Sequence, residues 1–469
     1  FRSVMERENL LRHIPQVEKI LQDPRITAYL PLLGRGVVVA LIRRETDFFR
    51  DRIRETGSFS EEELISSLAD RLSEKRLERL QRVVNATGIM IHTNLGRAPL
   101  SSPLMKSLAG VLSGYCNLEL YLPSLKRGRR GGFAEELLCH LTGAEDALIV
   151  NNNASSVFLL LNEFGRGKDV IISRGELVQI GGGFRIPDIL RQTGANLLEV
   201  GTTNITTLED FRGALSERAA MILSVHQSNF AQSGFCSSPT LRELASLKSP
   251  DLLFVRDLGS GNLMNDPRLP APFETTVAAE MAQGPDLLCF SGDKLLGACQ
   301  AGIVLGRKDL VARLKKNPLM RMLRVDKITY YLLQETLLHY MNGEPERVSL
   351  WNMALSDRKV LTRRIGRFLR EVGDPPPGAS LQRVDPGSAF GGGSLPTLEI
   401  ESAGVQISIS GLGAEEILTR LTRSPIPVVG YILNDQCTLD FRTVLEEDIS
   451  AVAEAVRRLF GKNRETGEA

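Results

Sequence analysis

The stretch FSGDKLLGACQAGIVLG, residues 290–306, decides the fold because it joins two short apolar strands through a glycine-rich turn. The turn carries one lysine, Lys294, directly after Ser291, Gly292 and Asp293. A lysine that follows a strand is ordinarily a surface charge. Its meaning therefore depends on which residues follow the other strands of the same sheet.

Around this stretch, short apolar strands alternate with helical segments from residue 86 onward. The predicted strands are DALIV (146–150), DVIIS (169–173), NLLEV (196–200), AAMILSV (219–225), DLLFVRD (251–257), DLLCFS (286–291) and AGIVLG (301–306). This alternation predicts an α/β fold with a mostly parallel sheet covered by helices on both faces. Ligands of such sheets bind beyond the carboxyl ends of the strands.

Two further strand ends carry side chains that suit one cofactor. After strand 146–150, residues Asn153, Ala154 and Ser155 open a helix whose free N–H groups suit a phosphate, although ordinary capping explains them equally well. Asp257 stands at the tip of strand 251–257, before a Gly-Ser-Gly loop. A carboxylate there can cap a turn, or it can pair with the protonated ring nitrogen of pyridoxal phosphate.

A phosphate cradle, an acid and a lysine in this order predict a pyridoxal phosphate site. Lys294 would form the Schiff base, because burial lowers the pKa of an amine and makes it nucleophilic. Asp257 would keep the pyridinium protonated. His226, in VHQSNF after strand 219–225, is placed to stack on the ring, with a packed core histidine as the alternative.

The composition of the chain limits its domain number, its location and its classes of partner. The 469 residues are 42% hydrophobic, which is ample for a large core and more than one domain. Apolar runs such as GVVVALI (36–42) are far shorter than the roughly 18 residues that span a bilayer, so no membrane partner is expected. The six cysteines are scattered without a C-x-x-C pair, which predicts reduced thiols, a cytoplasmic location and no metal site. Lys+Arg (57) and Asp+Glu (56) balance, so overall charge favours no class of partner.

Three regions are expected along the chain. Residues 1–80 have helical periodicity with acids and bases nearly balanced, and Ser60 is a predicted N-cap before Glu61–Glu63. Residues 81–345 form the α/β core that binds the cofactor. Residues 346–469 form a small α+β domain, which includes the Pro/Gly segment GDPPPGAS and alternating strand patterns.

Five segments resemble one known family, bacterial selenocysteine synthase, the L-seryl-tRNA(Sec) selenium transferase. They are RVVNATGIMIHTNLGRAPLS (82–101), GGGFRIPDIL (181–190), EVGTTN (199–204), FSGDKLLGACQAGIVLG (290–306) and RMLRVDKIT (321–329). The resemblance runs from about residue 9 to 460, so it covers nearly the whole chain.

This resemblance implies a fold-type-I, aspartate aminotransferase-like enzyme dependent on pyridoxal 5'-phosphate, assembled as a homodecamer of dimers. It implies Lys294 as the Schiff-base lysine and Asp293 as a functional acid. It also assigns Arg97, Arg321 and Arg324 to the site of the anionic donor selenophosphate. Arginine suits that role because its planar fork matches phosphate oxygens.

The reaction implied by the resemblance converts L-seryl-tRNA(Sec) to L-selenocysteinyl-tRNA(Sec) through dehydroalanyl-tRNA bound to the cofactor. Lys294 would act as acid and base in its proton transfers. The helical domain, residues 1–80, would bind the tRNA. The basic loop KRGRRGG (126–132) is a second candidate for phosphate contact, with a solvated loop as the alternative.

The chain also departs from the family's pattern. Phe133 stands where the family has histidine, Ile205 where it has arginine, and Cys299 where it has proline. Two other functions therefore stay open: a pyridoxal phosphate lyase acting on a small amino or sugar acid, and a tRNA-binding scaffold without activity. The N-terminal helical domain argues against the lyase. The presence of Asp257, Lys294 and the three arginines argues against the scaffold.

Overall fold

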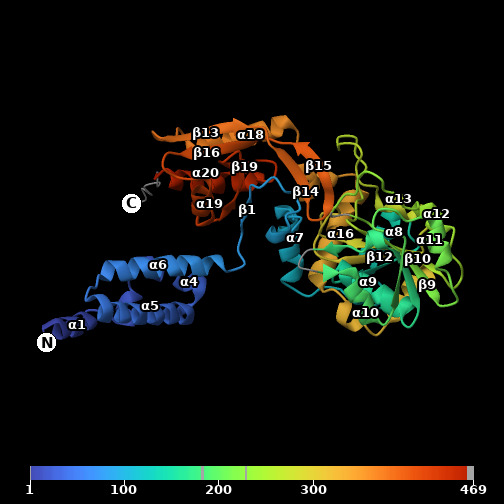
Figure 1. Ribbon diagram of the computed structural model, residues 1–469, viewed down its shortest axis with the longest axis horizontal. Helices are drawn as coiled ribbons and strands as arrows, with labels where there is room; N and C mark the ends of the chain where they lie inside the picture. The colour runs from blue at the N-terminus through green and yellow to red at the C-terminus, as the bar shows by residue number, and fades with distance from the viewer. Residues whose placement is uncertain (1, 181–183, 228–229, 462–469) are drawn as a thin grey trace. The chain divides into compact units, whose positions relative to one another are not determined.

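The computed structural model describes residues 2–180, 184–227 and 230–461 (Figure 1). The chain forms two compact units. The first comprises Phe1–Val84, Glu415–Val429 and Glu454–Ala469, and the second comprises Asn85–Ala414 and Gly430–Ala453. The functional boundaries after residues 80 and 345 stay predictions.

The first unit begins with the predicted helical region. Its helices are α1 (Arg2–Arg12), α2 (Val17–Ile20), α3 (Pro24–Thr27), α4 (Leu30–Leu33), α5 (Arg35–Thr56) and α6 (Glu61–Leu77). Ser60 caps α6 as predicted, because its hydroxyl accepts from Glu63 N at 3.3 Å. Apolar residues of α5 and α6, such as Ile42, Phe49, Leu64 and Leu68, form one buried cluster.

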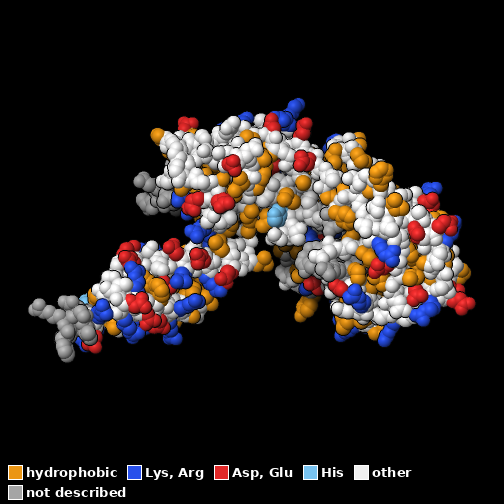
Figure 2. Space-filling view, viewed as in Figure 1, with side chains coloured by type: hydrophobic (Ala, Val, Ile, Leu, Met, Phe, Trp, Pro, Cys, Tyr) orange, Lys and Arg blue, Asp and Glu red, His pale blue; other side chains and the backbone are white. Residues whose placement is uncertain are grey.

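The surface of this unit mixes charges of both signs. Lys19 pairs with Glu61 at 3.0 Å and Arg52 with Glu63 at 2.9 Å, so many bases are already matched by acids. Figure 2 shows blue and red side chains interspersed over these helices. The nearly equal numbers of acids and bases in this region therefore form ion pairs on its surface.

A seven-stranded sheet forms the centre of the second unit. Its strands are β4 (Asp146–Val150), β5 (Asp169–Ser173), β8 (Asn196–Val200), β9 (Ala219–Val225), β10 (Leu253–Gly259), β11 (Leu287–Ser291) and β12 (Gly302–Gly306). Their order is β4-β12-β11-β10-β9-β5-β8. Only β12 within this sheet runs antiparallel to its neighbours, so the predicted mostly parallel sheet is confirmed.

One strand lies differently from its predicted position. β10 begins and ends two residues later than 251–257, so Asp257 lies inside the strand and not at its tip. At its start, a tight turn in which Leu252 N donates to Ser249 O at 3.2 Å takes Asp251 out of the strand. At its end, pairing with β11 continues to Gly259, which stands opposite Phe290. In the ladder, Asp257 stands opposite Val225 of β9 and Cys289 of β11.

Helices cover both faces of the sheet, as the apolar strands predict. One face packs against α9 (Asn153–Leu160), α10 (Ile186–Thr193) and α14 (Lys308–Lys316). The other packs against α8 (Gly132–Thr142), α11 (Leu208–Gly213), α12 (Leu241–Ala245) and α16 (Lys327–Met341). Figure 1 shows α8, α9 and α16 around β12.

Backbone hydrogen bonds connect the motif at 82–101 to the C-terminal part of the same unit. Met90 N donates to Ala389 O at 3.0 Å and Ile91 N to Phe390 O at 2.7 Å, beside β14 (Gly387–Gly391). Gly88 has φ +74°, and a Cβ there would stand 2.6 Å from Asp440 Oδ2. Only glycine fits such an approach.

The C-terminal strands form two small antiparallel sheets. One contains β13 (Ala379–Val384), β16 (Gly404–Ile409), β19 (Gln436–Asp440) and β18 (Tyr431–Leu433); the other pairs β14 with β15 (Ser394–Glu401). Helices α17 (Ser349–Ala354) and α18 (Arg358–Val372) precede these strands, α19 (Ala414–Thr422) lies between β16 and β18, and α20 (Ile449–Leu459) follows β19.

The remaining α-helices and strands of the described chain lie between these elements. They are α7 (Ser102–Leu112), α13 (Val277–Met281), α15 (Met320–Leu323), and the strands β1 (Val84–Asn85), β2 (Leu120–Tyr121), β3 (Lys126–Arg127), β6 (Gln179–Ile180), β7 (Phe184–Arg185) and β17 (Val428–Val429). None of the helices in the described ranges combines the length and the apolar character needed to cross a membrane.

Candidate active site

Lys294 lies in a closed turn directly after β11. Gly297 N donates to Lys294 O at 2.9 Å, and Gly292 N donates to Ala301 O at the same distance. The lysine side chain is buried, with 6% of the residue exposed. Burial lowers its pKa, Arg97 lowers it further, and the charge of Asp257 opposes the shift. The turn therefore holds an amine that loses its proton more readily than a surface lysine.

Asp257 is buried and held by two neighbours. Asn153 Nδ2 donates to Asp257 Oδ1 at 2.8 Å, and Cys289 Sγ lies 3.7 Å from the same oxygen. Burial raises the pKa of Asp257, while the bond from Asn153 and the charge of Lys294 lower it. Asn153, which the sequence suggests as part of a phosphate cradle, thus contacts the predicted ring-nitrogen partner.

The start of α9 follows β4 as predicted. Asn152 Oδ1 accepts from Ser155 N at 2.9 Å, so one N–H group of the first turn is capped by a side chain. Ser156 Oγ is buried without a partner. A Cβ on Gly302 would stand 2.1 Å from Asn152 O, so β12 approaches this turn as only glycine allows. Ala154 lies in the same first turn.

His226 lies directly after β9, beside Asp257. Its backbone N donates to Asp257 O at 2.8 Å. Burial, Arg256 and Lys294 lower the pKa of the imidazole to about 4, against a smaller opposing effect of Glu280. Its Nδ1 is buried without a partner. The ring is therefore neutral near pH 7, which suits stacking on a cofactor.

Arg97 and Asp293 form an ion pair one residue from Lys294. Arg97 Nη1 lies 2.7 Å from Asp293 Oδ2, and Ala98 N donates to Asp293 O at 3.3 Å. Arg97 has φ +63°, held by its N–H bond of 2.9 Å to His92 O. A pocket of about 410 Å³ opens here, lined by Thr93, Gly96, Arg97, Ala98, Leu100, Asp293, Ala298, Cys299 and Gln300.

The other two predicted donor arginines lie elsewhere. Arg321 is exposed on α15, and Arg324 is half-buried just after it. Asn151 N donates to Leu323 O at 3.0 Å, which places Arg324 next to the end of β4. Neither arginine has an ion-pair partner among the described residues, and neither lines the pocket beside Arg97.

The basic loop 126–132 is largely neutralised. Arg127 pairs with Glu119 at 3.1 Å, Arg130 with Glu119 at 3.6 Å, and Arg129 with Glu135 at 2.7 Å. A Cβ on Gly131 would stand 1.9 Å from the Tyr330 ring, so the loop is also packed against α16. These contacts favour the solvated-loop alternative over phosphate contact.

The structure also shows the surroundings of the residues that depart from the family pattern. Phe133 and Ile205 are exposed, with 49% and 42% of each residue accessible. Cys299 lines the pocket beside Arg97, and burial raises its pKa to about 12, so it stays a thiol. In the motif 181–190, residues 181–183 lie outside the described residues.

A buried polar network that the sequence did not reveal lies beside Asp257. Arg256 Nε donates to Glu280 Oε2 at 2.9 Å and its Nη1 to Ser224 Oγ at 2.8 Å. Ser224 Oγ donates in turn to Glu176 Oε1 at 3.0 Å, and burial raises the pKa of Glu176 to about 7. An arginine inside an apolar strand was the available signal, because such a charge needs a partner.

The geometry fits a pyridoxal phosphate site. A buried amine faces a buried carboxylate, and Asn153 Oδ1, His226 Nδ1 and Ser260 Oγ are buried near them without partners. Buried polar atoms without partners are uncommon in folded proteins, so three in one region indicate that a ligand completes their bonds.

Fold and site together define the class: the chain has the aminotransferase-like fold of pyridoxal phosphate-dependent enzymes. The solved structure of D-glucosaminate-6-phosphate ammonia-lyase aligns with a TM-score of 0.55 and 19% identity, over 81% of this chain and 96% of that one. At this identity the likeness concerns the fold alone.

The chain belongs to the L-seryl-tRNA selenium transferase family, whose family model matches residues 83–445. A second model, selenocysteine synthase N terminal, matches residues 11–47. The L-seryl-tRNA(Sec) selenium transferase of Geotalea daltonii is 41% identical, over 96% of this chain and 99% of its own. That of Clostridium botulinum (strain Okra) is 36% identical, over 97% and 100%. The resemblance seen in the sequence is confirmed.

Proposed function

We propose that this protein converts L-seryl-tRNA(Sec) to L-selenocysteinyl-tRNA(Sec), with selenophosphate as selenium donor and pyridoxal 5'-phosphate bound at Lys294. The observation that carries the proposal is full-length similarity: relatives with this activity in their names are 36–41% identical over 96–97% of the chain. The lyase alternative has only a likeness of fold at 19% identity. The cofactor, when bound, accepts the electron pair left at Cα of the seryl group.

Each site residue has a role in this proposal. Lys294 holds the cofactor and, once released, takes the Cα proton and supplies a proton later in the reaction. Asp257 pairs with the ring nitrogen, and Asn153 orients Asp257 through its 2.8 Å bond. His226, as a neutral imidazole, would stack on the ring. The start of α9, at Asn153, Ala154 and Ser155, receives the phosphate.

The donor site is proposed around Arg97. Its pocket contains one guanidinium and the carboxylate of Asp293, and a small dianion suits a guanidinium fork. Asp293 acts as the functional acid beside Lys294. Arg321 and Arg324 complete the donor site in this proposal. Support for them is the family assignment together with their freedom from ion pairs among the described residues.

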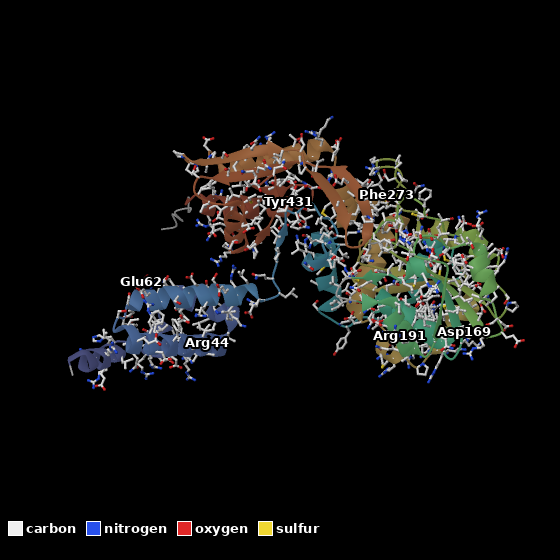
Figure 3. The ribbon with its side chains drawn as sticks, in the orientation of Figure 1. Arg44, Glu62, Asp169, Arg191, Phe273 and Tyr431 are labelled. Carbon is white, nitrogen blue, oxygen red and sulfur yellow. The ribbon has the colours of Figure 1, made fainter. Side chains whose placement is uncertain are left out.

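The partners follow the same family assignment. Residues 1–80 bind the tRNA. The protein assembles as a homodecamer built from dimers, and its location is cytoplasmic. On α5, Arg43 and Arg44 (Arg44 is labelled in Figure 3) are exposed and have no ion-pair partner among the described residues. Reversing both charges should weaken tRNA binding and flatten its salt dependence. Arg50→Glu is the control, since Arg50 already pairs with Asp47.

The decisive experiment incubates the protein with Ser-tRNA(Sec), selenophosphate and pyridoxal phosphate, and then identifies the esterified amino acid. Selenocysteine is the expected product, and Lys294→Ala should abolish both the product and the visible absorbance of the bound cofactor. Unchanged serine, together with turnover of a small amino or sugar acid, would contradict the proposal and favour the lyase.

A further inference from the structure

Cys289 is a buried thiol that the proposed reaction has not yet used. It lies in β11 with 0% of the residue exposed, and its Sγ lies 3.7 Å from Asp257 Oδ1. Burial raises the pKa of this thiol well above its ordinary value, and the negative charge of Asp257 raises it further. Cys289 therefore keeps its proton, and its S–H group is the donor in the contact with the carboxylate.

The register of the central sheet brings these two side chains together. Cys289 stands opposite Asp257 where β11 pairs with β10, and residues opposite each other in a ladder point to the same face of the sheet. Cys289 belongs to the apolar cluster on the face that α9 covers, as do Val255 and Leu287, which lie two residues before Asp257 and Cys289. Asn153 of α9 contacts Asp257 from that face. The contact is thus determined by strand pairing and not by a loop.

Only one of the two residues opposite Asp257 can donate a hydrogen bond from its side chain. The residue in register on β9 is Val225, which has no polar side-chain atom. The residue in register on β11 is Cys289. A thiol suits this position, because it packs among apolar side chains at lower cost than a hydroxyl or an amide and still offers a weak donor.

Both side-chain donors act on the same oxygen of Asp257. Asn153 Nδ2 donates to Oδ1 at 2.8 Å, and the Cys289 thiol approaches that atom as well. Among the residues that the structure describes, none donates to Asp257 Oδ2. The second oxygen is therefore the one available to the ring N–H of pyridoxal phosphate.

The contact also affects the charge of Asp257. Burial raises the pKa of this carboxyl, while the bond from Asn153, the charges of Lys294 and Arg256, and the bond from Cys289 lower it. The thiol therefore favours the ionised carboxylate. That is the form that pairs with a protonated pyridine nitrogen.

We propose that Cys289 is a positioning residue for the cofactor: its S–H group donates to Asp257 Oδ1 and, together with Asn153, leaves Oδ2 to accept from the ring nitrogen. The inference rests on the proposed function, because it takes Asp257 as the partner of the pyridinium. Cys289 acts through Asp257, and none of its own bonds forms or breaks in the reaction.

The test compares Cys289→Ala with Cys437→Ala in the full-length protein freed of cofactor. Cys437 is equally buried but lies in β19 of the C-terminal four-stranded sheet, and its thiol has no hydrogen bond among the described residues. The infrared S–H stretching band that Cys289→Ala removes should lie at lower frequency than the band that Cys437→Ala removes, because donation to a carboxylate weakens the S–H bond. In Asp257→Asn, the Cys289 band should move to higher frequency.

A second measurement follows Asp257 and the cofactor. Cys289→Ala should shift the titration of the Asp257 carboxyl band to higher pH, since a bond that lowers the pKa of Asp257 is lost. It should also weaken the binding of pyridoxal phosphate about threefold, as expected for the loss of one weak hydrogen bond. Cys437→Ala should change neither quantity.

Coincident S–H bands for the two cysteines, or an equal loss of cofactor affinity in the two variants, would overturn the proposal. Should Cys289→Ala not fold, Cys289→Val keeps the space filled and removes the donor, and its spectrum and cofactor affinity are judged by the same criteria. These measurements require neither tRNA nor selenophosphate, so their outcome is separate from that of the selenium-transfer assay.

Discussion

Arg97 Nη1 lies 2.7 Å from Asp293 Oδ2, so the arginine of the proposed donor pocket is bound to the acid next to Lys294. An anion that enters the pocket competes with Asp293 for the guanidinium. Asp293 Oδ1 is buried without a partner, so this carboxylate depends on Arg97 for its pairing. If the donor binds at Arg97 as proposed, its binding and the charge distribution around Lys294 are connected through this ion pair.

Arg97→Ala should raise the KM for selenophosphate and lower kcat/KM by roughly 100-fold, because a charge-assisted contact to the anion is lost. Cofactor absorbance should persist. Steady-state kinetics with varied donor, alongside an absorbance spectrum, check both. Arg129→Ala is the control, since Arg129 pairs with Glu135 outside the pocket. Equal losses in the two variants would contradict the placement of the donor at Arg97.

Asn153→Ala should weaken cofactor binding by about tenfold, since a hydrogen bond to a buried charged group contributes about 1.5–3 kcal/mol. The lost bond also lets the pKa of Asp257 rise further, because the bond from Asn153 lowers it. A spectroscopic titration with pyridoxal phosphate measures the change. Asn204→Ala removes a comparable amide bond, to Phe235 O at 2.6 Å in an exposed loop, and should leave the affinity unaltered.

His226 predicts a pH dependence of stability. Its folded pKa, about 4, lies below its ordinary value of 6.5, so the unfolded chain binds more protons between these values. Stability therefore rises with pH through this window and falls on acidification, by about 2–3 kcal/mol from this group. His226→Gln should lose less stability than the native protein between pH 6.5 and 4.5, as measured by urea midpoints. His140→Gln, which replaces an exposed histidine, is the control substitution.

Alanine substitutions at two glycines distinguish the cost of backbone strain from the cost of a steric clash. Gly88 and Gly143 both have φ +74°, but a Cβ on Gly88 would stand 2.6 Å from Asp440 Oδ2, whereas one on Gly143 meets nothing within 4 Å. Gly143→Ala should cost about 1 kcal/mol through strain alone. Gly88→Ala should lower stability by about 2 kcal/mol more, because the Asp440 side chain must move to make room for the new Cβ. Thermal denaturation of both variants measures the difference, and equal costs would show that Asp440 moves freely.

The order of strands in the chain was predictable from local pattern. Strand 146–150 and strand 219–225 have the predicted bounds, because continuous apolar runs between polar segments have few alternatives in a sheet buried on both faces. The bounds of β10 were not, because a turn at Ser249–Leu252 precedes the strand and its pairing with β11 continues to Gly259. How far two strands stay paired is not a property of local hydrophobicity.

Lys294, Asp257 and the motif containing Arg97 stood out as candidates in the sequence alone. Lys294 follows a strand, Asp257 belongs to one, and Arg97 stands in a long motif. Tertiary structure alone decided that Asn153 binds Asp257, that Arg97 binds Asp293 and that Arg256 pairs with Glu280. These pairs join residues 24 to 196 positions apart. Burial and partnership at such separations depend on how sheets and loops pack, which no local pattern of residues encodes.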